Sequence, residues 1–456
     1  MLIDEKKKIF SEQKRVINNC YKYLAGIEKN GVKTYHTPYS FFTTWTKSFG
    51  YFKILHLRKK KISLIFFIYL LKNILSILKF GSFELLYNKK IFDKKNYRSV
   101  ILSYCDRYSF REGNFFFDKY FGVSSREIDD NIFILISLDN FVPNKINEKV
   151  IILKRKISLF NVLFFIYFFF QVFFKCKINL KNFLHYFNYE YFFIVKLNTV
   201  FKKFFLNIKF KNFLINYEGI NFQNFFLEKV KKINKNIRTI GYLHCAPWPL
   251  QTDLICRTKF LDKLFVSSHD QKNVLYKYFK WSKKKIFKIP SLRFDKLNNN
   301  EFSNFVFLPY DILNKKKYLD YFKSLLILLP AGELGKLNTR IHPLNKNSKT
   351  HQILAYELEI IIKKFQYKID ESIKNVSVFI GSATGVCSQA LEENNIIYHI
   401  PGDHILDVFS PYIWKSIDVS VVSKGIFKYS IKRKNKVFCV NSEKKKFIKY
   451  INPHLK

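Results

Sequence analysis

Short apolar runs alternate with longer amphipathic stretches along most of the chain. Short unbroken apolar runs are typical of strands buried on both faces, and apolar residues three and four positions apart indicate helices. Residues 222–233 have the helical spacing, with Phe222, Phe225, Phe226 and Val230 on one face. The alternation predicts a parallel sheet with helices on both faces. The strands of this first series are expected at 99–105, 131–138, 150–155, 211–219, 237–245 and 262–268.

A second series of the same kind follows the polar stretch 295–304. Its strands are expected at 324–330, 339–343, 376–382 and 396–401. Only residues 331–338 separate the first two of these strands, which is too short for the helix that joins parallel strands. Either that helix is lost or one of the two strands is wrongly assigned.

The two series predict an α/β protein of two Rossmann-like domains, each a doubly wound parallel sheet, which face one another across a cleft. Extra helices are expected before the first domain. The expected parts are a helical basic region at 1–95, an N-terminal domain at 96–294, a linker at 295–305 and a C-terminal domain at 306–456.

Ligands of such sheets bind beyond the carboxyl ends of the strands. The predicted strand 376–382 runs into the turn 381–385, which a helix follows. Gly381 and Gly385 allow a sharp turn close to a ligand, and Ser382 and Thr384 offer hydroxyls. Free N–H groups at the start of the helix complete a pocket for a phosphate. The alternative is ordinary capping of the helix by Ser or Thr.

A second set of polar residues ends the predicted strand 339–343. A guanidinium and an imidazole, from Arg340 and His342, can hydrogen-bond phosphate or ribose oxygens, and Pro343 would end the strand and fix the turn. A surface histidine before a turn is the alternative interpretation.

In the first series, Glu218 stands at the end of a predicted strand, and Gly219 allows a tight turn after it. A carboxylate in this position can act as a general base that deprotonates a hydroxyl, or it can favour the start of the next helix. His244, Trp248 and Asp253 are expected around the same rim. The indole is suited to stacking on a sugar ring and equally to plugging a hydrophobic gap.

The loop 401–414 carries Asp403, Asp407 and Ser410, which are expected to reach a sugar or a ribose. Their spacing fits no metal template, and the seven cysteines form no Cys-x-x-Cys pair. We therefore expect no metal site and no disulfide framework.

The net charge of the chain predicts an anionic partner. The chain has 79 basic and 35 acidic residues, a net charge of +44. Only 12 of the basic residues are arginine, the side chain on which nucleic-acid sites depend most, and no nucleic-acid motif is present. We expect no nucleic acid as a partner, and an anionic membrane surface or an anionic sugar donor instead.

The apolar run 157–174 is 18 residues long, barely enough to span a bilayer. Strands on both sides of it belong to one predicted sheet, which a spanning helix would divide, so a buried or interfacial helix is expected. The shorter apolar run 62–71 lies beside basic residues. With no leader at the start of the sequence, we expect a cytoplasmic protein at the inner face of the membrane.

The order of these motifs carries a resemblance. Tyr-Glu-Gly at a strand end, His-Pro in the second series and Gly-Ser-x-Thr-Gly opening a helix resemble the GT-B glycosyltransferases. More narrowly, the chain is similar to bacterial surface-carbohydrate biosynthesis proteins and distantly to the sialyl- and polysialyltransferases. The likeness covers about 210–425. In those enzymes the first motif is acid-acid-Gly, and Tyr217 stands here in place of the first acid.

The resemblance implies that Glu218 is the catalytic base, that His342 and Pro343 bind the nucleotide and that Ser382 and Thr384 hold the donor phosphate. It implies an inverting, metal-independent transferase of capsule, O-antigen or lipopolysaccharide synthesis, with a nucleotide-sugar donor, a glycan or glycolipid acceptor and no further cofactor. The N-terminal domain would bind the acceptor. A CDP-glycerol-like phosphotransferase, a nucleotide-sugar epimerase and a non-catalytic membrane scaffold stay open as alternatives.

Overall fold

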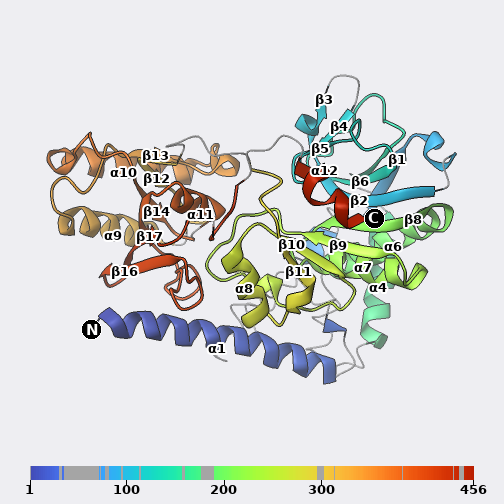
Figure 1. Ribbon diagram of the computed structural model, residues 1–456, viewed down its shortest axis with the longest axis horizontal. Helices are drawn as coiled ribbons and strands as arrows, with labels where there is room; N and C mark the ends of the chain where they lie inside the picture. The colour runs from blue at the N-terminus through green and yellow to red at the C-terminus, as the bar shows by residue number, and fades with distance from the viewer. Residues whose placement is uncertain are drawn as a thin grey trace.

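The chain folds into two α/β lobes, each built on its own sheet, as a computed structural model shows (Figure 1). The residues that the structure describes are 2–29, 33–34, 71, 73–77, 82–93, 96–111, 115–156, 160–175, 189–294, 302–312, 314–382, 384–434, 436–440 and 446–455.

The first lobe contains an eight-stranded sheet in the order β1-β7-β6-β2-β8-β9-β10-β11. All neighbours in it are parallel except β1, which pairs antiparallel with β7. All six strands predicted for the first series are present. The strands are β1 (Ser82–Tyr87), β2 (Asn96–Cys105), β6 (Asn131–Ser137), β7 (Val150–Lys156), β8 (Lys209–Asn216), β9 (Arg238–Tyr242), β10 (Lys263–Val266) and β11 (Ile286–Lys288).

Both faces of this sheet are covered, which is why its strands read as unbroken apolar runs. Every residue of β6 is buried, and alternate side chains enter two separate cores. Helices α6 (Tyr189–Asn207) and α7 (Asn221–Ile233) contribute to one core. The short C-terminal helix α12 (Lys446–Tyr450) contributes Phe447 to the other. A small antiparallel sheet of β3 (Phe110–Arg111), β4 (Phe115–Asp118) and β5 (Val123–Ser124) lies beside them.

The second lobe contains a six-stranded sheet in the order β13-β12-β14-β15-β17-β16. The first four strands in this order are parallel, and the last two complete the sheet in antiparallel fashion. The strands are β12 (Phe305–Phe307), β13 (Asn338–Arg340), β14 (Val376–Ile380), β15 (Ile396–Ile400), β16 (Ile417–Ser423) and β17 (Ile426–Ile431). The helices are α9 (Lys315–Leu328), α10 (Lys349–Lys364) and α11 (Gly385–Glu392).

One predicted strand of this lobe, 324–330, is wrong. The run forms the end of helix α9, whose residues Tyr318, Phe322, Leu325 and Leu326 are buried at helical spacing. Asn314 caps the helix, because its side chain accepts a hydrogen bond from the backbone of Lys317. The strand that pairs with β13 is β12, which the sequence did not predict. Helix α9 is therefore the crossover between β12 and β13, and the short connection at 331–338 leads from helix to strand.

The apolar run 157–174 supplies helix α4 (Phe160–Lys175). Phe168 packs on α6, where its ring centroid lies 5.1 Å from that of Phe192, and Val172 is buried in the same core. Within the described ranges, the structure contains no helix with the length and apolarity needed to cross a membrane. Residues 62–70 lie outside the described residues.

The long helix α1 (Leu2–Lys29) lies across both lobes (Figure 1). The Gln13 amide donates to the backbone carbonyls of Ile405 (2.7 Å) and Val408 (2.8 Å) in the second lobe. Tyr21 on the same helix donates to the Tyr278 carbonyl, after α8 (His269–Lys277) in the first lobe.

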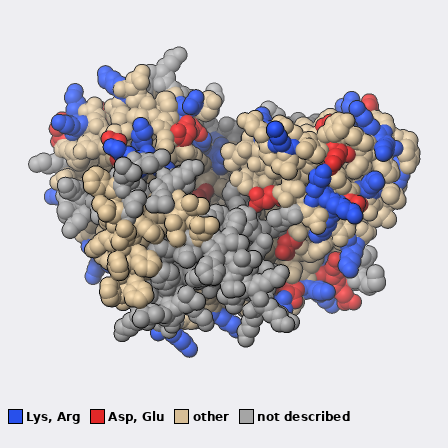
Figure 2. All heavy atoms as spheres, turned by 180° about the vertical axis from the view of Figure 1, so that it is seen from behind, with Lys and Arg blue, Asp and Glu red and all other residues tan. Residues whose placement is uncertain are grey.

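The predicted architecture is confirmed in its main part: the chain contains two Rossmann-like sheets, each built mainly of parallel strands and accompanied by helices. The space-filling view shows the two lobes with a notch between them at one edge (Figure 2).

Candidate functional site

Glu218 lies just beyond the carboxyl end of β8, in a turn that the surrounding residues hold in place. The Gln223 side-chain oxygen accepts a hydrogen bond from the Glu218 backbone N–H at 2.8 Å. Gly219 has a φ of +74°, and a Cβ there would collide with the carbonyl oxygen of Asp253. Arg257 donates a hydrogen bond to the Gly219 carbonyl. The turn therefore requires glycine at position 219, as the sequence predicted, and this turn helps to set the direction of the Glu218 side chain.

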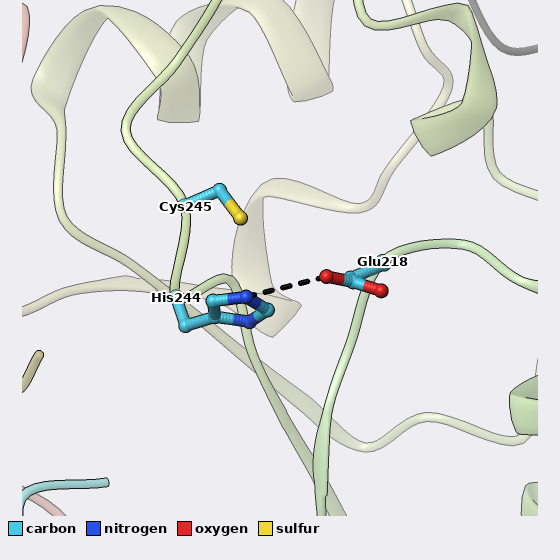
Figure 3. Close-up of side chains that lie close together, drawn as sticks. All are labelled: Glu218, His244 and Cys245. Atoms are coloured by element: carbon cyan, nitrogen blue, oxygen red, sulfur yellow. Dashed lines mark ion pairs between the residues drawn. The ribbon is translucent and has the colours of Figure 1, made fainter. Parts of the chain in front are cut away.

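The carboxylate of Glu218 meets a histidine from the next strand. His244 follows β9, and its Nε2 lies 3.2 Å from Glu218 Oε1 (Figure 3). His244 is buried, whereas the Glu218 side chain is 31% exposed. The thiol of Cys245 points into the same space. Two neighbouring parallel strands therefore bring an acid and an imidazole together at one sheet edge.

Burial sets the protonation of this pair. It raises the pKa of Glu218 to about 7, although the Arg293 guanidinium acts in the opposite direction. Burial, and after it the same guanidinium, holds the pKa of His244 well below its ordinary range. His244 is therefore neutral, and the tautomer that hydrogen-bonds Glu218 carries its proton on Nε2. A carboxyl with a pKa near neutrality is suited to accepting a proton.

Glu218, His244 and Cys245 also offer three donor atoms that lie within 4.8 Å of one another. Oxygen, nitrogen and sulfur together form a zinc-type set. Two observations weigh against a resident ion. The charge of Arg293 acts on all three residues. The Nδ1 atom of His244 is buried and has no hydrogen-bond partner among the described residues, whereas ligating imidazoles normally donate through their second nitrogen. The residues fit an acid–imidazole pair better than a metal centre.

Two members of this site were missed in the sequence. The Tyr120 ring lies edge-on to the His244 ring, with centroids 4.6 Å apart. The guanidinium carbon of Arg293 lies 5.2 Å from the centroid of the Tyr120 ring. Arg293 follows β11, and its place after a strand of the series was the available signal. Tyr120 comes from a turn after β4, and nothing in its sequence position pointed to the site.

In the second lobe, the predicted turn joins β14 to α11 as expected. Gly381 has a φ of +88° and lies against Pro309, and its carbonyl oxygen lies 2.8 Å from His399 Nε2. Thr384 occupies the N-cap position of α11, yet its side chain makes no capping hydrogen bond. Within the described part of the chain, no protein group hydrogen-bonds the hydroxyls of Ser382 and Thr384. Simple capping, the alternative for this turn, does not account for the two hydroxyls.

The carboxyl ends of β12, β13 and β14 lie next to one another, because β12 pairs with the other two strands. His342, after β13, lies edge-on to the Tyr310 ring with centroids 5.2 Å apart. Pro309, which contacts Gly381, immediately precedes that tyrosine. The His-Pro motif and the hydroxyl turn are thus linked by the loop after β12.

Arg340 takes a different direction. Its guanidinium carbon lies 5.2 to 5.8 Å from the ring centroids of Phe302, Phe305 and Phe307. Arg340 and Pro343 line a groove of about 610 Å³ between β13 and α10.

The two halves of the predicted site meet at the loop after His244. A Cβ on Gly385, the first residue of α11, would lie 3.2 Å from the Cβ of Ala246. The Ser388 hydroxyl donates to the Pro247 carbonyl. The acid of the first lobe and the turn of the second are therefore separated by the residues His244 to Ala246.

The remaining predicted residues lie in different settings. Trp248 is half-buried on the same loop, and its indole N–H has no partner among the described residues. Asp253 is buried beneath the turn at Gly219, and burial raises its pKa to about 7. In the loop 401–414, Asp403, Asp407 and Ser410 accept hydrogen bonds from backbone N–H groups of that loop.

Comparison with known proteins adds distant likenesses in shape. No family model and no curated protein matches the sequence. Among solved structures, α,α-trehalose 6-phosphate synthase from Burkholderia multivorans is 10% identical, with 63% of this chain and 77% of that chain covered and a TM-score of 0.34. A glycosyltransferase from Rickettsia africae is 11% identical, with 69% and 86% covered and a TM-score of 0.33. The wall teichoic acid polymerase TagF is 11% identical, with 75% and 78% covered and a TM-score of 0.29. Likenesses this loose decide nothing about the function of this chain.

Proposed function

We propose that the protein is a glycosyltransferase that moves a sugar from a nucleotide-sugar donor to a hydroxyl of a glycan or a glycolipid. One observation carries this proposal. The loop that begins at His244, the partner of Glu218, continues to Ala246, which packs on Gly385 at the end of the hydroxyl-bearing turn of the second lobe. A proton acceptor and a phosphate-binding turn in one site are what such a transfer needs.

In the proposed reaction, Glu218 takes the proton of the acceptor hydroxyl while the hydroxyl oxygen bonds to the anomeric carbon of the donor. The bond between that carbon and the phosphate oxygen breaks, and its electron pair leaves with the nucleotide. Attack from the side opposite the leaving phosphate inverts the anomeric carbon. His244 orients the Glu218 carboxylate through the 3.2 Å contact. The His244 ring is a positioning group, because the neutral imidazole donates a hydrogen bond to the Glu218 carboxylate and takes no part in the proton transfer.

The second lobe stabilises the leaving nucleotide. Ser382, Thr384 and the first N–H groups of α11 face a developing negative charge, and His342 adds a ring nitrogen. Fixed donors of this kind are worth on the order of a hundredfold in rate each. Arg340 and Pro343, on the groove beside α10, are proposed to contact the nucleotide farther from the reacting carbon. We propose that no metal takes part, because the protein supplies these donors.

We place the reaction in the synthesis of surface polysaccharide, as the motif order suggests, in an enzyme of bacterial type. A phosphotransferase with a CDP-glycerol-like donor would use the same turn, and it differs in leaving a phosphodiester in the product. Mass spectrometry of the product distinguishes the two.

Binding of nucleotides is the first experiment. We expect one of UDP, CDP, CMP or GDP, in large excess over its dissociation constant, to stabilise the protein by about 3 kcal/mol in thermal unfolding. The double variant Ser382→Ala, Thr384→Ala should lose that gain. If no nucleotide or nucleotide sugar binds, the transferase proposal is wrong.

We further propose that helix α4 attaches the enzyme to the cytoplasmic face of an anionic membrane. One side of α4 packs on α6, and the other sides expose large apolar residues. These include Phe160 (77% exposed), Leu163 (65%), Phe170 (53%) and Phe174 (75%). Exposed apolar surface of this extent marks an interaction site, and an apolar helix beside basic groups is typical of binding to anionic lipid.

Basic residues line a groove beside α1. A groove of about 1100 Å³ between α1 and the end of α8 is lined by Lys14, Arg15, Lys22, Lys277 and Lys280. In Figure 1, α1 runs along the bottom of the molecule and α4 lies at the lower right.

Vesicle sedimentation tests the attachment. The variant Phe160→Ser, Phe170→Ser, Phe174→Ser should lose most of its binding to vesicles that contain phosphatidylglycerol. A control with Ile327→Ser and Leu328→Ser, two exposed apolar residues of α9, should bind as the unchanged protein does. Equal loss in both variants, or equal binding to neutral phosphatidylcholine vesicles, would contradict the attachment through α4 and anionic lipid.

A further inference from the structure

The first lobe contains an arginine, Arg293, whose backbone is held in place and whose guanidinium forms no hydrogen bond or ion pair with any residue that the structure describes. The backbone N–H of Leu292 donates to the Tyr242 hydroxyl at 2.8 Å. The residue before it, Ser291, donates its N–H to the Cys439 carbonyl, also at 2.8 Å. Gly122 packs directly against the Leu292 carbonyl, where a Cβ would collide. These contacts fix the backbone on which Arg293 stands.

The guanidinium of Arg293 contacts two rings and no acceptor. Its central carbon lies 5.2 Å from the centroid of the Tyr120 ring and 4.9 Å from that of the Phe294 ring. Among the residues described by the structure, none forms a hydrogen bond or an ion pair with it. Contact with aromatic rings leaves the N–H groups at the edge of the guanidinium free. The side chain is only half-buried, so a ligand can reach it.

A chain of contacts places this guanidinium beside the proposed base. Arg293 lies over Tyr120, the Tyr120 ring touches the His244 ring at 4.6 Å, and His244 Nε2 lies 3.2 Å from Glu218. Glu218 itself forms no ion pair with Arg293 within 4.0 Å. The cation is therefore available to a group on the substrate.

The chemistry of the guanidinium indicates which kind of substrate group it would bind. Arginine presents its N–H donors in a planar fork that matches the oxygens of a phosphate or a carboxylate. The hydroxyls of Ser382 and Thr384, in the second lobe, already provide for the donor phosphate. Arg293 belongs to the first lobe, as does the base that acts on the acceptor.

We propose that Arg293 binds an acidic group of the acceptor, so that the enzyme glycosylates a hydroxyl close to a phosphate or a carboxylate. This inference rests on the proposed function, because it is the transferase reaction that assigns the first lobe to the acceptor.

Calorimetric titration with two acidic sugars and one neutral sugar tests the proposal. The acidic sugars are glucose 6-phosphate and glucuronate, and glucose is the neutral reference. We expect the protein to bind at least one acidic sugar about tenfold or more tightly than glucose, since a hydrogen bond to a charged group has that effect. The variant Arg293→Gln should lose this preference. Arg126→Gln, which removes a guanidinium that lies over the Phe115 ring, should keep it.

UDP, CDP, CMP and GDP form the second arm. The best of them should bind equally to the protein and to Arg293→Gln. If Arg293→Gln weakens nucleotide binding instead, the guanidinium holds the donor phosphate and the acceptor assignment is wrong. If Arg293→Gln keeps the preference for acidic sugars, or if the unchanged protein shows no such preference, the proposal is also wrong. Arg293-dependent binding of an acidic sugar without any nucleotide binding would leave the anion site standing and overturn the transferase.

Discussion

Glu218 combines a fixed position with a carboxyl that is hard to ionise. Gln223 and Gly219 set its backbone, His244 contacts its side chain, and burial raises its pKa to about 7. A base acts only when deprotonated, so kcat/KM should fall about tenfold for each pH unit below 7 and level off above it. A pH profile of transfer measures this. Glu218→Gln should show no transfer at any pH with an unchanged unfolding curve.

The same profile separates the roles of two neighbours. The Arg293 guanidinium lowers the pKa of Glu218, so Arg293→Gln should move the midpoint of the profile to higher pH. The pKa of His244 lies well below this range, so its titration does not produce the limb near pH 7. A midpoint that stays in place in Arg293→Gln would show that the two side chains do not interact.

The glycine after the base should be among the least replaceable residues. Its φ of +74° disfavours any side chain, and a Cβ would collide with the Asp253 carbonyl. Gly219→Ala is expected to lower the free energy of unfolding by about 1–3 kcal/mol, measured in urea. Gly26 in α1 has no atom near its Cβ position, so Gly26→Ala should raise the free energy by up to about 1 kcal/mol. Destabilisation by both variants would contradict this account of Gly219.

At the scale of single residues, the sequence predicted Glu218 and His244, which follow neighbouring strands, and missed Arg293 after β11 and Tyr120 from a separate turn. Glu218 and His244 could be found because β8 and β9 are neighbours in a parallel sheet. Tyr120 reaches the site through a turn after β4, and that turn is positioned by the packing of Gly122 on Leu292. Contacts of that kind join distant parts of the chain and leave no periodic signal in it.

Helix α11 provides a prediction at the scale of one element. Its N-cap residue, Thr384, makes no capping hydrogen bond, whereas the Ser268 side chain at the start of α8 accepts one from the Gln271 N–H at 2.9 Å. Ser268→Ala should therefore cost about 1 kcal/mol of stability and leave nucleotide binding unchanged. Thr384→Ala should leave the stability unchanged and weaken nucleotide binding. Thermal unfolding with and without nucleotide measures both effects. If Thr384→Ala loses as much stability as Ser268→Ala, Thr384 is an ordinary capping residue.

The assignment of elements failed where an apolar run was read without its surroundings. The run at 324–330 has the composition of a buried strand, but it continues the helical spacing of Tyr318 and Phe322. The short strand β12 was hidden because only Phe305–Phe307 form it, next to a polar stretch. Length and start signals decide such cases better than hydrophobicity does.

At the scale of the whole molecule, helix α1 connects parts of the chain whose contact no sequence pattern predicts. Its buried residues belong to the largest core, together with Val408 and Trp414 from the second lobe. The C-terminal residues return to the first lobe, where Arg238 donates to the His454 carbonyl at 2.8 Å. Both crossings depend on tertiary contacts between the ends and the middle of the chain, and local patterns carry no information about them.

The brace formed by α1 can be tested at Gln13, whose side chain is fully buried. Its amide nitrogen donates to two carbonyls of the second lobe, Ile405 and Val408. Gln13→Ala removes the donor from both, and each buried carbonyl left without it costs about 1–3 kcal/mol. We expect urea unfolding at a lower midpoint, with the second lobe losing its structure first. Gln352 donates to the Lys346 carbonyl at the surface, so Gln352→Ala should change the free energy of unfolding by less than about 0.5 kcal/mol. Equal effects of the two substitutions would show that α1 only covers the lobes and does not hold them together.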